Sequence, residues 1–270
     1  MKITTIARNP GNSPNMVAND AAILERITTL LAEQGAEVIA VNEDEEIPRD
    51  TQVVCTMSRT AATIERLKRA ERQGIIVVNS TTAVENCSRK RFMELLECNG
   101  IPQPAYKVVS GADRLMVGLF PCWMKRANGW SCHKDDVCYV QNREEAACAI
   151  ERMAQRGEQE FIQMQHCEGD IVKFYGIAGR LFHYSYPTSG KFGHEKINGT
   201  PRHYAFNAAV LEDIAQRAAQ ALGLEIFGGD AIITPQGDIY IIDINDFPSF
   251  TAVREDAARE IAALIMNKRK

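Results

Sequence analysis

The first 80 residues alternate short apolar runs with amphipathic stretches, and this alternation constrains the fold more than any other feature of the sequence. Helices are predicted after the first and third runs, because apolar residues there recur at helical spacing. Strands connected through helices lie parallel with right-handed crossovers, so this region is expected to form an α/β domain around a parallel sheet. The expected strands are residues 3–7, 37–41, 51–56 and 75–78.

Charge and composition argue against several functional classes. The chain has 270 residues and a net charge of −4, which gives no electrostatic basis for binding nucleic acid or an anionic membrane. No apolar run reaches transmembrane length and no signal peptide is recognisable, so we expect a cytoplasmic protein.

The eight cysteines include no Cys-x-x-Cys pair, and most are expected to be reduced core residues. The first turn lacks Gly-x-Gly-x-x-Gly, which argues against a dinucleotide site. The oligomeric state stays open, with a homodimer as one candidate.

After residue 80 the pattern changes. A helix through Phe92 and Leu96 is expected to end before the two prolines of Gly100-Ile-Pro-Gln-Pro104. A polar loop is expected at 188–204, and a final amphipathic helix carries Ile261 and Ile265. Strands are predicted at 121–125, 137–140, 161–165, 170–177, 181–186, 225–234 and 239–245, with helices at about 144–156 and around 210–222.

The last two predicted strands place acidic side chains inside apolar runs. Centring the intervening loop on Gln236-Gly237 sets Asp230 directly opposite Asp243. Two carboxylates about 5 Å apart across a ladder repel each other unless something neutralises them. A three-residue loop would shift this register, and the alternative is that the acids simply begin a turn.

A third oxygen ligand follows on the same strand. Asn245 shares a face with Asp243 because side chains alternate along a strand, and its expected neighbour Gly228 leaves space beside it. Two carboxylates and an amide oxygen form a hard-oxygen site suited to Mg²⁺, with water and phosphate completing the shell. The predicted metal ligands are Asp230, Asp243 and Asn245.

With that pair in place, the chain from about residue 79 to its end resembles the ATP-grasp superfamily. Asp230 followed 13 and 15 residues later by Asp243 and Asn245 is similar to the superfamily's metal signature. Gly228-Gly-Asp-Ala-Ile-Ile233 and the strand that follows it look like the branch containing inositol polyphosphate kinases. They are almost as close to the ribosomal-protein glutamate ligase branch.

The resemblance implies a three-lobed ATP-grasp fold. An N-terminal parallel-sheet domain (1–80) would be followed by a linker helix with a small central lobe (81–164) and a C-terminal lobe with the metal site (165–270). The two α+β lobes would clamp ATP with one or two Mg²⁺ ions, and Mn²⁺ is the alternative ion.

The resemblance also implies residues that hold the phosphates. Lys125 ends an apolar strand, and a point cation on a rigid strand suits phosphate binding. Lys90 resembles a second phosphate-binding lysine, although Arg89 or Arg91 can align with it equally well. The loop 127–136 resembles a flap over the phosphates. It keeps only Gly129, and its Trp130 offers the alternative of closing over a substrate.

Contacts to the nucleoside are implied by the strand 161–165, which resembles an inter-lobe strand that binds adenine through its backbone. Gln163, Met164 and Gln165 are the expected contacts. Asp170 resembles a residue near the ribose or the phosphates.

The remaining candidates are cations for the transferred group. Lys173 lies on an otherwise apolar strand face, so it needs an anionic partner, which we take to be the substrate or the γ-phosphate. The alternative is that Lys173 forms a structural ion pair. In the polar loop, Lys191, Lys196 and Arg202 are candidates. Arg202 is favoured because a guanidinium grips phosphate or carboxylate with two hydrogen bonds.

Three functions remain open. A ligase would activate a small-molecule or peptide carboxylate as an acyl phosphate for attack by an amine, and most of the superfamily works this way. A kinase would transfer the phosphoryl group to an alcohol, as in the inositol phosphate kinases. A non-catalytic ATP-binding module is the third reading. We favour the ligase, since the chain lacks the dense basic cluster that a polyanionic substrate requires.

Overall fold

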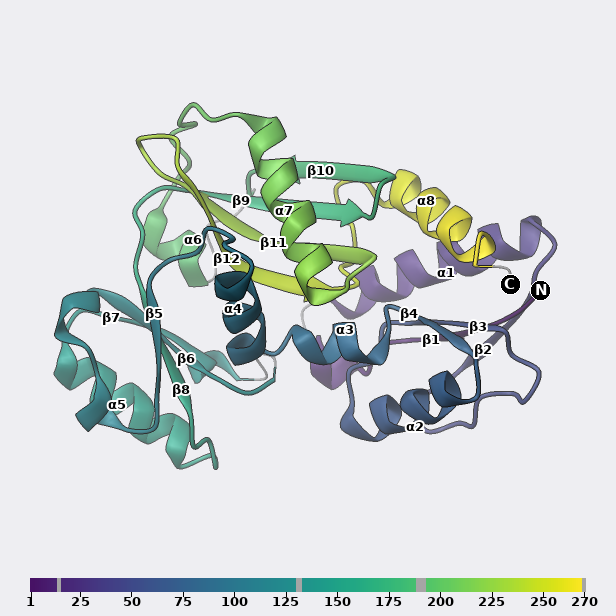
Figure 1. Ribbon diagram of the computed structural model, residues 1–270, viewed down its shortest axis with the longest axis horizontal. Coiled ribbons are helices and arrows are strands. Elements are labelled where there is room, and N and C mark those ends of the chain that lie inside the picture. The colour runs from purple at the N-terminus through teal and green to yellow at the C-terminus, as the bar shows by residue number, and fades with distance from the viewer. Residues whose placement is uncertain (14–15, 130–132, 188–192, 269–270) are drawn as a thin grey trace.

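The computed structural model describes residues 1–13, 16–129, 133–187 and 193–268, which form three four-stranded sheets (Figure 1). The first sheet is parallel, and the other two are antiparallel. The predicted α/β fold class is confirmed. No helix in the described ranges is both long and apolar enough to cross a membrane.

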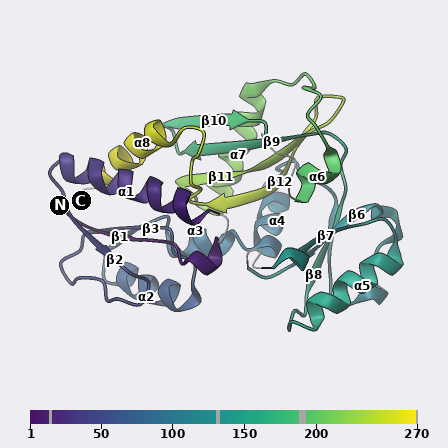
Figure 2. The ribbon, with the colours of Figure 1, turned by 180° about the vertical axis from the view of Figure 1, so that it is seen from behind.

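The N-terminal sheet is the one predicted from the strand–helix alternation. Its elements are β1 (Lys2–Ile6), η1 (Pro10–Asn12), α1 (Val17–Glu33), β2 (Glu37–Val41), β3 (Val53–Thr56), α2 (Ala61–Arg72) and β4 (Ile76–Val78). The strand order is β2-β1-β3-β4. Because both faces of this sheet are apolar, helices cover it from two sides, with α1 on one face and α2 on the other (Figures 1 and 2).

The last helix of the chain also belongs to this region. Helix α8 (Arg254–Met266) packs along α1, and its Ile261 and Ile265 are buried in one core with Ile23 and Ile27. The final helix predicted for the C-terminal lobe therefore completes the core of the N-terminal domain, as both ribbon views show (Figures 1 and 2).

The single helix expected after residue 81 is two helices, α3 (Thr81–Asn86) and α4 (Arg89–Cys98). The break comes at Ser88, whose extended backbone makes it the N-cap of the second helix. The break places Arg89 at the first position of α4, beside the cleft described below.

The central lobe is an antiparallel sheet covered by one helix. Its elements are β5 (Tyr106–Val109), η2 (Ala112–Arg114), η3 (Val117–Leu119), β6 (Cys122–Arg126), η4 (Lys134–Asp136), β7 (Val137–Val140), α5 (Arg143–Ala154) and β8 (Phe161–Gln165). The strand order is β5-β8-β6-β7. The sequence analysis missed β5, which is a short edge strand that follows two prolines and is only partly buried.

The C-terminal lobe carries the second antiparallel sheet, with the strand order β10-β9-β11-β12. Its elements are β9 (Asp170–Ile177), β10 (Leu181–Ser185), α6 (Gly193–Asn198), α7 (Ala208–Leu222), β11 (Ile226–Ile233) and β12 (Ile239–Asp246). Helix α6 lies in the segment expected to be a polar loop. A buried core shared by α4, α7 and both antiparallel sheets joins the two lobes.

The hairpin of β11 and β12 brings the two acids together by a route that the sequence analysis did not predict. Thr234 hydrogen-bonds Asp238 across a three-residue loop, in which Gly237 has a φ of +86°. This loop shifts the register by one, so that Ile233 pairs with Ile239. An extra residue, Ile242, then bulges from β12, and Asp230 again lies opposite Asp243.

Candidate functional site

The candidate site begins on the exposed face of the last hairpin. Asp230 is paired with Asp243 on one side and with Lys173 on the other, so the three side chains share a face of the sheet. The Lys173 Nζ lies 3.1 Å from Asp230 Oδ1, and the Asn245 Nδ2 donates to Asp243 Oδ2 at 2.9 Å. The predicted meeting of the two carboxylates and the amide is confirmed.

This donor set fits a hard divalent cation. Among the described residues no group of three His, Cys, Asp or Glu side chains gathers closely enough to hold a metal. Two carboxylates and an amide leave several positions for water and phosphate oxygens, which is how Mg²⁺ is usually held.

One detail of the prediction was wrong. A Cβ at Gly228 would lie only 2.8 Å from Pro248 Cγ, so this glycine makes room for Pro248 and not for the Asn245 amide.

Lys125 lies at the end of β6 with its ammonium buried between the lobes. Its Nζ donates to the Ile242 carbonyl at 3.4 Å and lies 3.6 Å from Met164 Sδ. The carbonyl is that of the bulge residue on β12. Burial and, to a smaller extent, the charge of Arg89 lower the pKa of Lys125 to about 7, against the opposing charges of Asp243 and Asp230. The charges of both acids of the hairpin therefore act on the pKa of Lys125.

A small cavity of about 150 Å³ lies against the same face. It contains two guanidinium groups from different parts of the chain, Arg59 after β3 and Arg89 at the start of α4. A space of this size beside two cations and two metal-type ligands suits one phosphate or carboxylate group. The lining residues are Asn12, Arg59, Cys87, Arg89, Gly129, Asp243 and Asn245.

Lys90 and its neighbour Arg89 have different surroundings. The Lys90 Nζ donates to both carboxylate oxygens of Glu160, at 2.8 and 3.0 Å, which raises the pKa of Lys90. Arg89, one of the two alternatives in the sequence, lines the small cavity. The role of Lys90 at the phosphates stays a prediction, and Arg89 is the better placed candidate of this segment.

The inter-lobe strand β8 alternates its side chains, and only one of the three expected contacts faces the cleft. Met164 belongs to the core shared by the two lobes and contacts Lys125. Gln163 is fully buried on the opposite face, where its side-chain amide makes two hydrogen bonds of 2.8 Å with the Met116 backbone. Gln165 is exposed on the same face as Gln163. The side chains of Gln163 and Gln165 thus lie on the face opposite Met164, and binding of adenine through the backbone of this strand stays a prediction.

A second cavity of about 320 Å³ lies where β8 leads into β9. Asp170 is buried there, and its carboxylate accepts hydrogen bonds from the backbone N–H groups of Arg202 and Tyr204, at 2.7 and 2.9 Å. Asp170 thus fixes the loop that carries Arg202. The described linings of the two cavities share no residue, so the structure groups Arg202 with Asp170 and not with the paired acids.

An aromatic cluster at this second cavity was missed. The Trp123 Nε1 donates to His166 Nδ1 at 3.1 Å, and Tyr139 packs against both rings. Burial lowers the pKa of His166, which keeps its ring neutral and able to accept this bond. The signal in the sequence was the spacing of Trp123 two residues before Lys125, on the same strand face.

For the remaining predicted site residues, the structure gives little information about a role in the site. Lys191 and Trp130 lie outside the described residues. Lys196 is exposed on α6. Of the loop 127–136, the described parts are held in place, since Asp136 is buried and Arg156 lies 2.6 Å from it.

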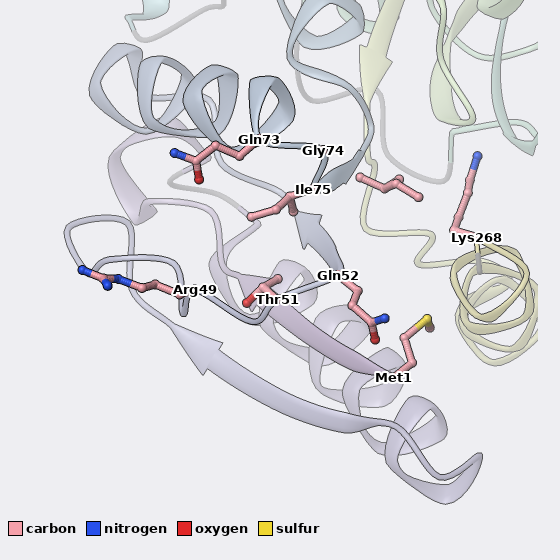
Figure 3. Close-up of a pocket in the computed structure, with 9 residues that line it drawn as sticks. Met1, Arg49, Thr51, Gln52, Gln73, Gly74, Ile75 and Lys268 are labelled. Atoms are coloured by element: carbon pink, nitrogen blue, oxygen red, sulfur yellow. The ribbon is translucent and has the colours of Figure 1, made fainter. Parts of the chain in front are cut away.

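The cavity in Figure 3 lies at the other end of the parallel sheet, where the strands begin. Its volume is about 420 Å³, and Arg49 and Lys268 lie on opposite sides without converging (Figure 3). None of the described residues in its lining is acidic.

Comparison with solved structures identifies the architecture. A RimK domain ATP-grasp protein from Sphaerobacter thermophilus superposes with a TM-score of 0.76 at 16% identity, over 98% of this chain and 100% of that one. The chain has the ATP-grasp fold. The predicted resemblance to the ATP-grasp superfamily is confirmed.

Other ATP-grasp structures also superpose on this chain. D-alanine–D-alanine ligase from Bacillus anthracis has a TM-score of 0.73 at 13% identity, covering 99% of this chain and 98% of that one. The ATP-grasp ligase PsnB, in complex with a minimal precursor, has a TM-score of 0.67 at 16% identity and covers 99% of both chains. A family model described as the ATP-grasp domain of inositol 1,3,4-trisphosphate 5/6-kinase matches residues 198–260. No curated protein matches the sequence significantly.

Proposed function

We propose that this ATP-grasp protein is an ATP- and Mg²⁺-dependent ligase that joins a carboxylate to an amine. One observation carries the proposal: Asp243 and Asn245 line the same small cavity as Arg59 and Arg89, and Asp230 lies directly opposite Asp243 on the neighbouring strand. A cation site directly beside an anion site is what phosphoryl transfer requires, because the protein mainly positions groups and neutralises their charge. ATP and Mg²⁺ are abundant in the cytoplasm, where we expect the enzyme to act.

The roles of the residues follow from their positions. Asp230, Asp243 and Asn245 would hold one or two Mg²⁺ ions, which when bound neutralise phosphate charge. Lys125 and Arg89 would bind phosphate oxygens. Lys173 shares the face of the acids and is our candidate for stabilising the transferred group.

The nucleoside is assigned to the junction of the lobes. Met164 and the aromatic cluster around Trp123 would contact the base, and Asp170 would shape the ribose side through the loop that it holds. We move Arg202 from the transferred group to this nucleoside end, since it lines the cavity of Asp170.

The reaction takes place in two steps. A carboxylate oxygen of the substrate attacks the γ-phosphorus, the bond to the β-phosphate oxygen breaks, and ADP leaves. The amine then attacks the acyl carbon, the C–O bond to phosphate breaks, and the amine loses a proton as inorganic phosphate departs. Arg59 and Arg89 are placed to stabilise the negative charge on the acyl phosphate.

A kinase is the second candidate, favoured by the family model that matches residues 198–260. The ligase reading is supported by the fold neighbours named as ligases, one of which was solved with a precursor peptide. Small-molecule and peptide carboxylates are therefore both proposed as substrates.

Incubation with ATP, Mg²⁺, hydroxylamine and a panel of amino acids, dicarboxylic acids and peptides tests the proposal. We expect a hydroxamate and ADP, because hydroxylamine captures an acyl phosphate. The variant Asp243→Asn should lower this activity on the order of 100-fold, as expected when one charged group is lost from the transition state. Asp238→Asn, in the loop of the same hairpin and exposed, is the matched control and should leave the activity unchanged.

The two alternative functions, a kinase and a binding module, predict different outcomes of this experiment. Stable transfer of the γ-phosphoryl group to an alcohol would establish the kinase. Binding of ATP without turnover on any acceptor would leave a binding module. Full activity of Asp243→Asn would refute the assigned role of the paired acids.

A further inference from the structure

The largest of these cavities lies at the carboxyl ends of the parallel strands in the N-terminal domain. Its volume is about 930 Å³, enough for a molecule the size of an amino acid or a short peptide. Five charged side chains contribute to its wall, and three of them are acidic: Asp20, Glu43, Asp44, Arg8 and Arg66.

Asp20 is the exceptional group in this wall. It lies in the first turn of α1 and is only 6% exposed. Within the described ranges its carboxylate has a single polar contact, an ion contact of 3.5 Å with Arg8 Nη1. That distance is too long for a hydrogen bond, and Asp20 Oδ2 has no hydrogen-bond partner. Buried carboxylates normally accept several hydrogen bonds, so Asp20 has capacity for a donor.

Arg8 approaches Asp20 through Nη1, at a distance beyond a normal hydrogen bond, and its other two nitrogens donate to backbone carbonyls. Its Nε donates to the Met57 carbonyl at 3.1 Å, and its Nη2 donates to the Phe247 carbonyl at 2.7 Å. Burial and the neighbouring charge of Arg59 lower the pKa of Arg8 to about 10. Arg8 is therefore anchored to the backbone and only weakly neutralises Asp20.

The same arginine connects the cavity to the active site. Arg8 Nη2 and Arg59 Nη2 both donate to the Asp246 carbonyl, at 3.4 and 2.8 Å. Asp246 follows Asn245 directly, and Arg59 lines the small cavity beside the paired acids. Arg8 in the wall of the N-terminal cavity and Arg59 in the wall of the small cavity thus share one acceptor, which places the two cavities side by side.

We propose that this cavity binds the acid that the enzyme activates, and that this acid carries a primary ammonium group held by Asp20. The substrate class is an amino acid or a short peptide with a free amino end. A protonated amine has no lone pair to attack an acyl phosphate, so the ammonium at Asp20 identifies the substrate and does not react. Its carboxylate end would extend towards Arg59. The inference rests on the proposed ligase function. The acidic excess in the wall also disfavours a polyphosphorylated substrate.

Binding of a defined panel tests the inference on the intact protein. The probes are the standard amino acids in both hands and their dipeptides with glycine, each beside its N-acetylated form, followed by ligand-observed NMR without ATP. We expect at least one free amino compound to bind and its acetylated form not to bind. Asp20→Asn should weaken this binding about tenfold or more, the size of one charge-assisted hydrogen bond. Asp256→Asn, an exposed acid in the first turn of α8, is the matched control and should bind as the wild type does.

The outcomes separate this inference from the proposed function. If no compound binds, or if acetylated forms bind equally well, the ammonium site is refuted even if ATP is still turned over. The comparison of free and acetylated compounds uses only the wild type, so it stands even if Asp20→Asn fails to fold. If the panel binds through Asp20 but ATP and Mg²⁺ never produce ADP, the ligase proposal fails and the binding site remains.

Discussion

At the scale of single residues, Lys125 shows how burial prepares a group for a charged ligand. Among the described residues its Nζ has hydrogen-bond contacts with a carbonyl at 3.4 Å and a sulfur at 3.6 Å, so the ammonium form is poorly solvated. Burial accordingly lowers its pKa to about 7 from the usual 10.5. Phosphate oxygens would supply the missing negative charge and restore the ammonium form.

This predicts proton uptake when the nucleotide binds. At pH 8, binding of a non-hydrolysable ATP analogue with Mg²⁺ should take up about one proton per site, since Lys125 changes from mostly neutral to charged. Calorimetry in buffers of different ionisation enthalpy measures this uptake. Lys125→Met should abolish it, and wild-type heats that do not depend on the buffer would contradict the assignment.

The same shift makes the stability of the unliganded protein depend on pH. The folded pKa is depressed, so the unfolded chain binds more protons between about pH 7 and 10.5. The contribution of Lys125 to the free energy of unfolding therefore rises with pH across this window. In Lys125→Met this part of the pH dependence should be missing from urea titrations.

At the scale of elements, the hairpin of β11 and β12 depends on close backbone approach at Gly229. A Cβ there would lie 2.3 Å from the Asp243 carbonyl oxygen and 2.5 Å from Phe174 Cζ. The first neighbour is backbone, so it cannot move without opening the strand pair that carries the paired acids.

Gly229→Ala should therefore lower the free energy of unfolding by about 1–3 kcal/mol, the usual cost of overpacking. It should also weaken Mg²⁺-dependent ATP binding, because Asp243 is displaced. Gly118→Ala is the matched control, since nothing lies within 4 Å of its added Cβ, and it should stay within about 0.5 kcal/mol. Urea unfolding measures both variants, and a Gly229→Ala protein as stable as the wild type would be inconsistent with this packing.

The elements also show what the sequence could predict. Strands such as β8 and β9 are bounded by polar and turn residues, so their limits were readable. The short edge strand β5 after two prolines was not, nor was α6 inside a polar segment. The opposition of Asp230 and Asp243 was predicted correctly although the loop was not, because the extra residue Ile242 cancels the shift that the loop introduces. Hydrophobic periodicity indicates which face of a strand a residue occupies. It does not indicate that a shift introduced by a loop will be cancelled by a bulge in the next strand.

The site residues likewise divide into those that the sequence could identify and those that it could not. Asp243, Asn245 and Lys125 interrupt apolar strands, and this local contrast made them visible in the sequence. Arg59 and Asp20 are isolated charges in the N-terminal domain, and only tertiary packing brings them to the reaction side. No pattern in the sequence predicts that these side chains will lie near the reaction site.

At the scale of the whole molecule, a buried ion pair joins the N-terminal domain to the strand of the metal site. The Arg59 Nε lies 2.7 Å from Asp246 Oδ1, with side-chain exposures of 7% and 1%. Breaking such a pair from one side leaves an uncompensated buried charge.

Arg59→Met should therefore destabilise the protein by about 3–5 kcal/mol in urea unfolding. Replacing both partners, as Arg59→Met with Asp246→Leu, should recover much of that loss. Arg26→Met is the matched control, because Arg26 of α1 binds Glu255 of α8 in a partly exposed pair, whose loss should cost at most about 1 kcal/mol. Equal losses from the two single variants would show that the buried pair is not special.

Helix α8 has a consequence for how the protein is made. Ile23 and Ile27 of α1 share one core with sheet residues that precede or closely follow them and with Ile261 and Ile265 of α8, which leave the ribosome much later. This core therefore stays incomplete until the strands of both other lobes have been synthesised. The order in which the lobes complete their cores thus differs from the order in which they are translated.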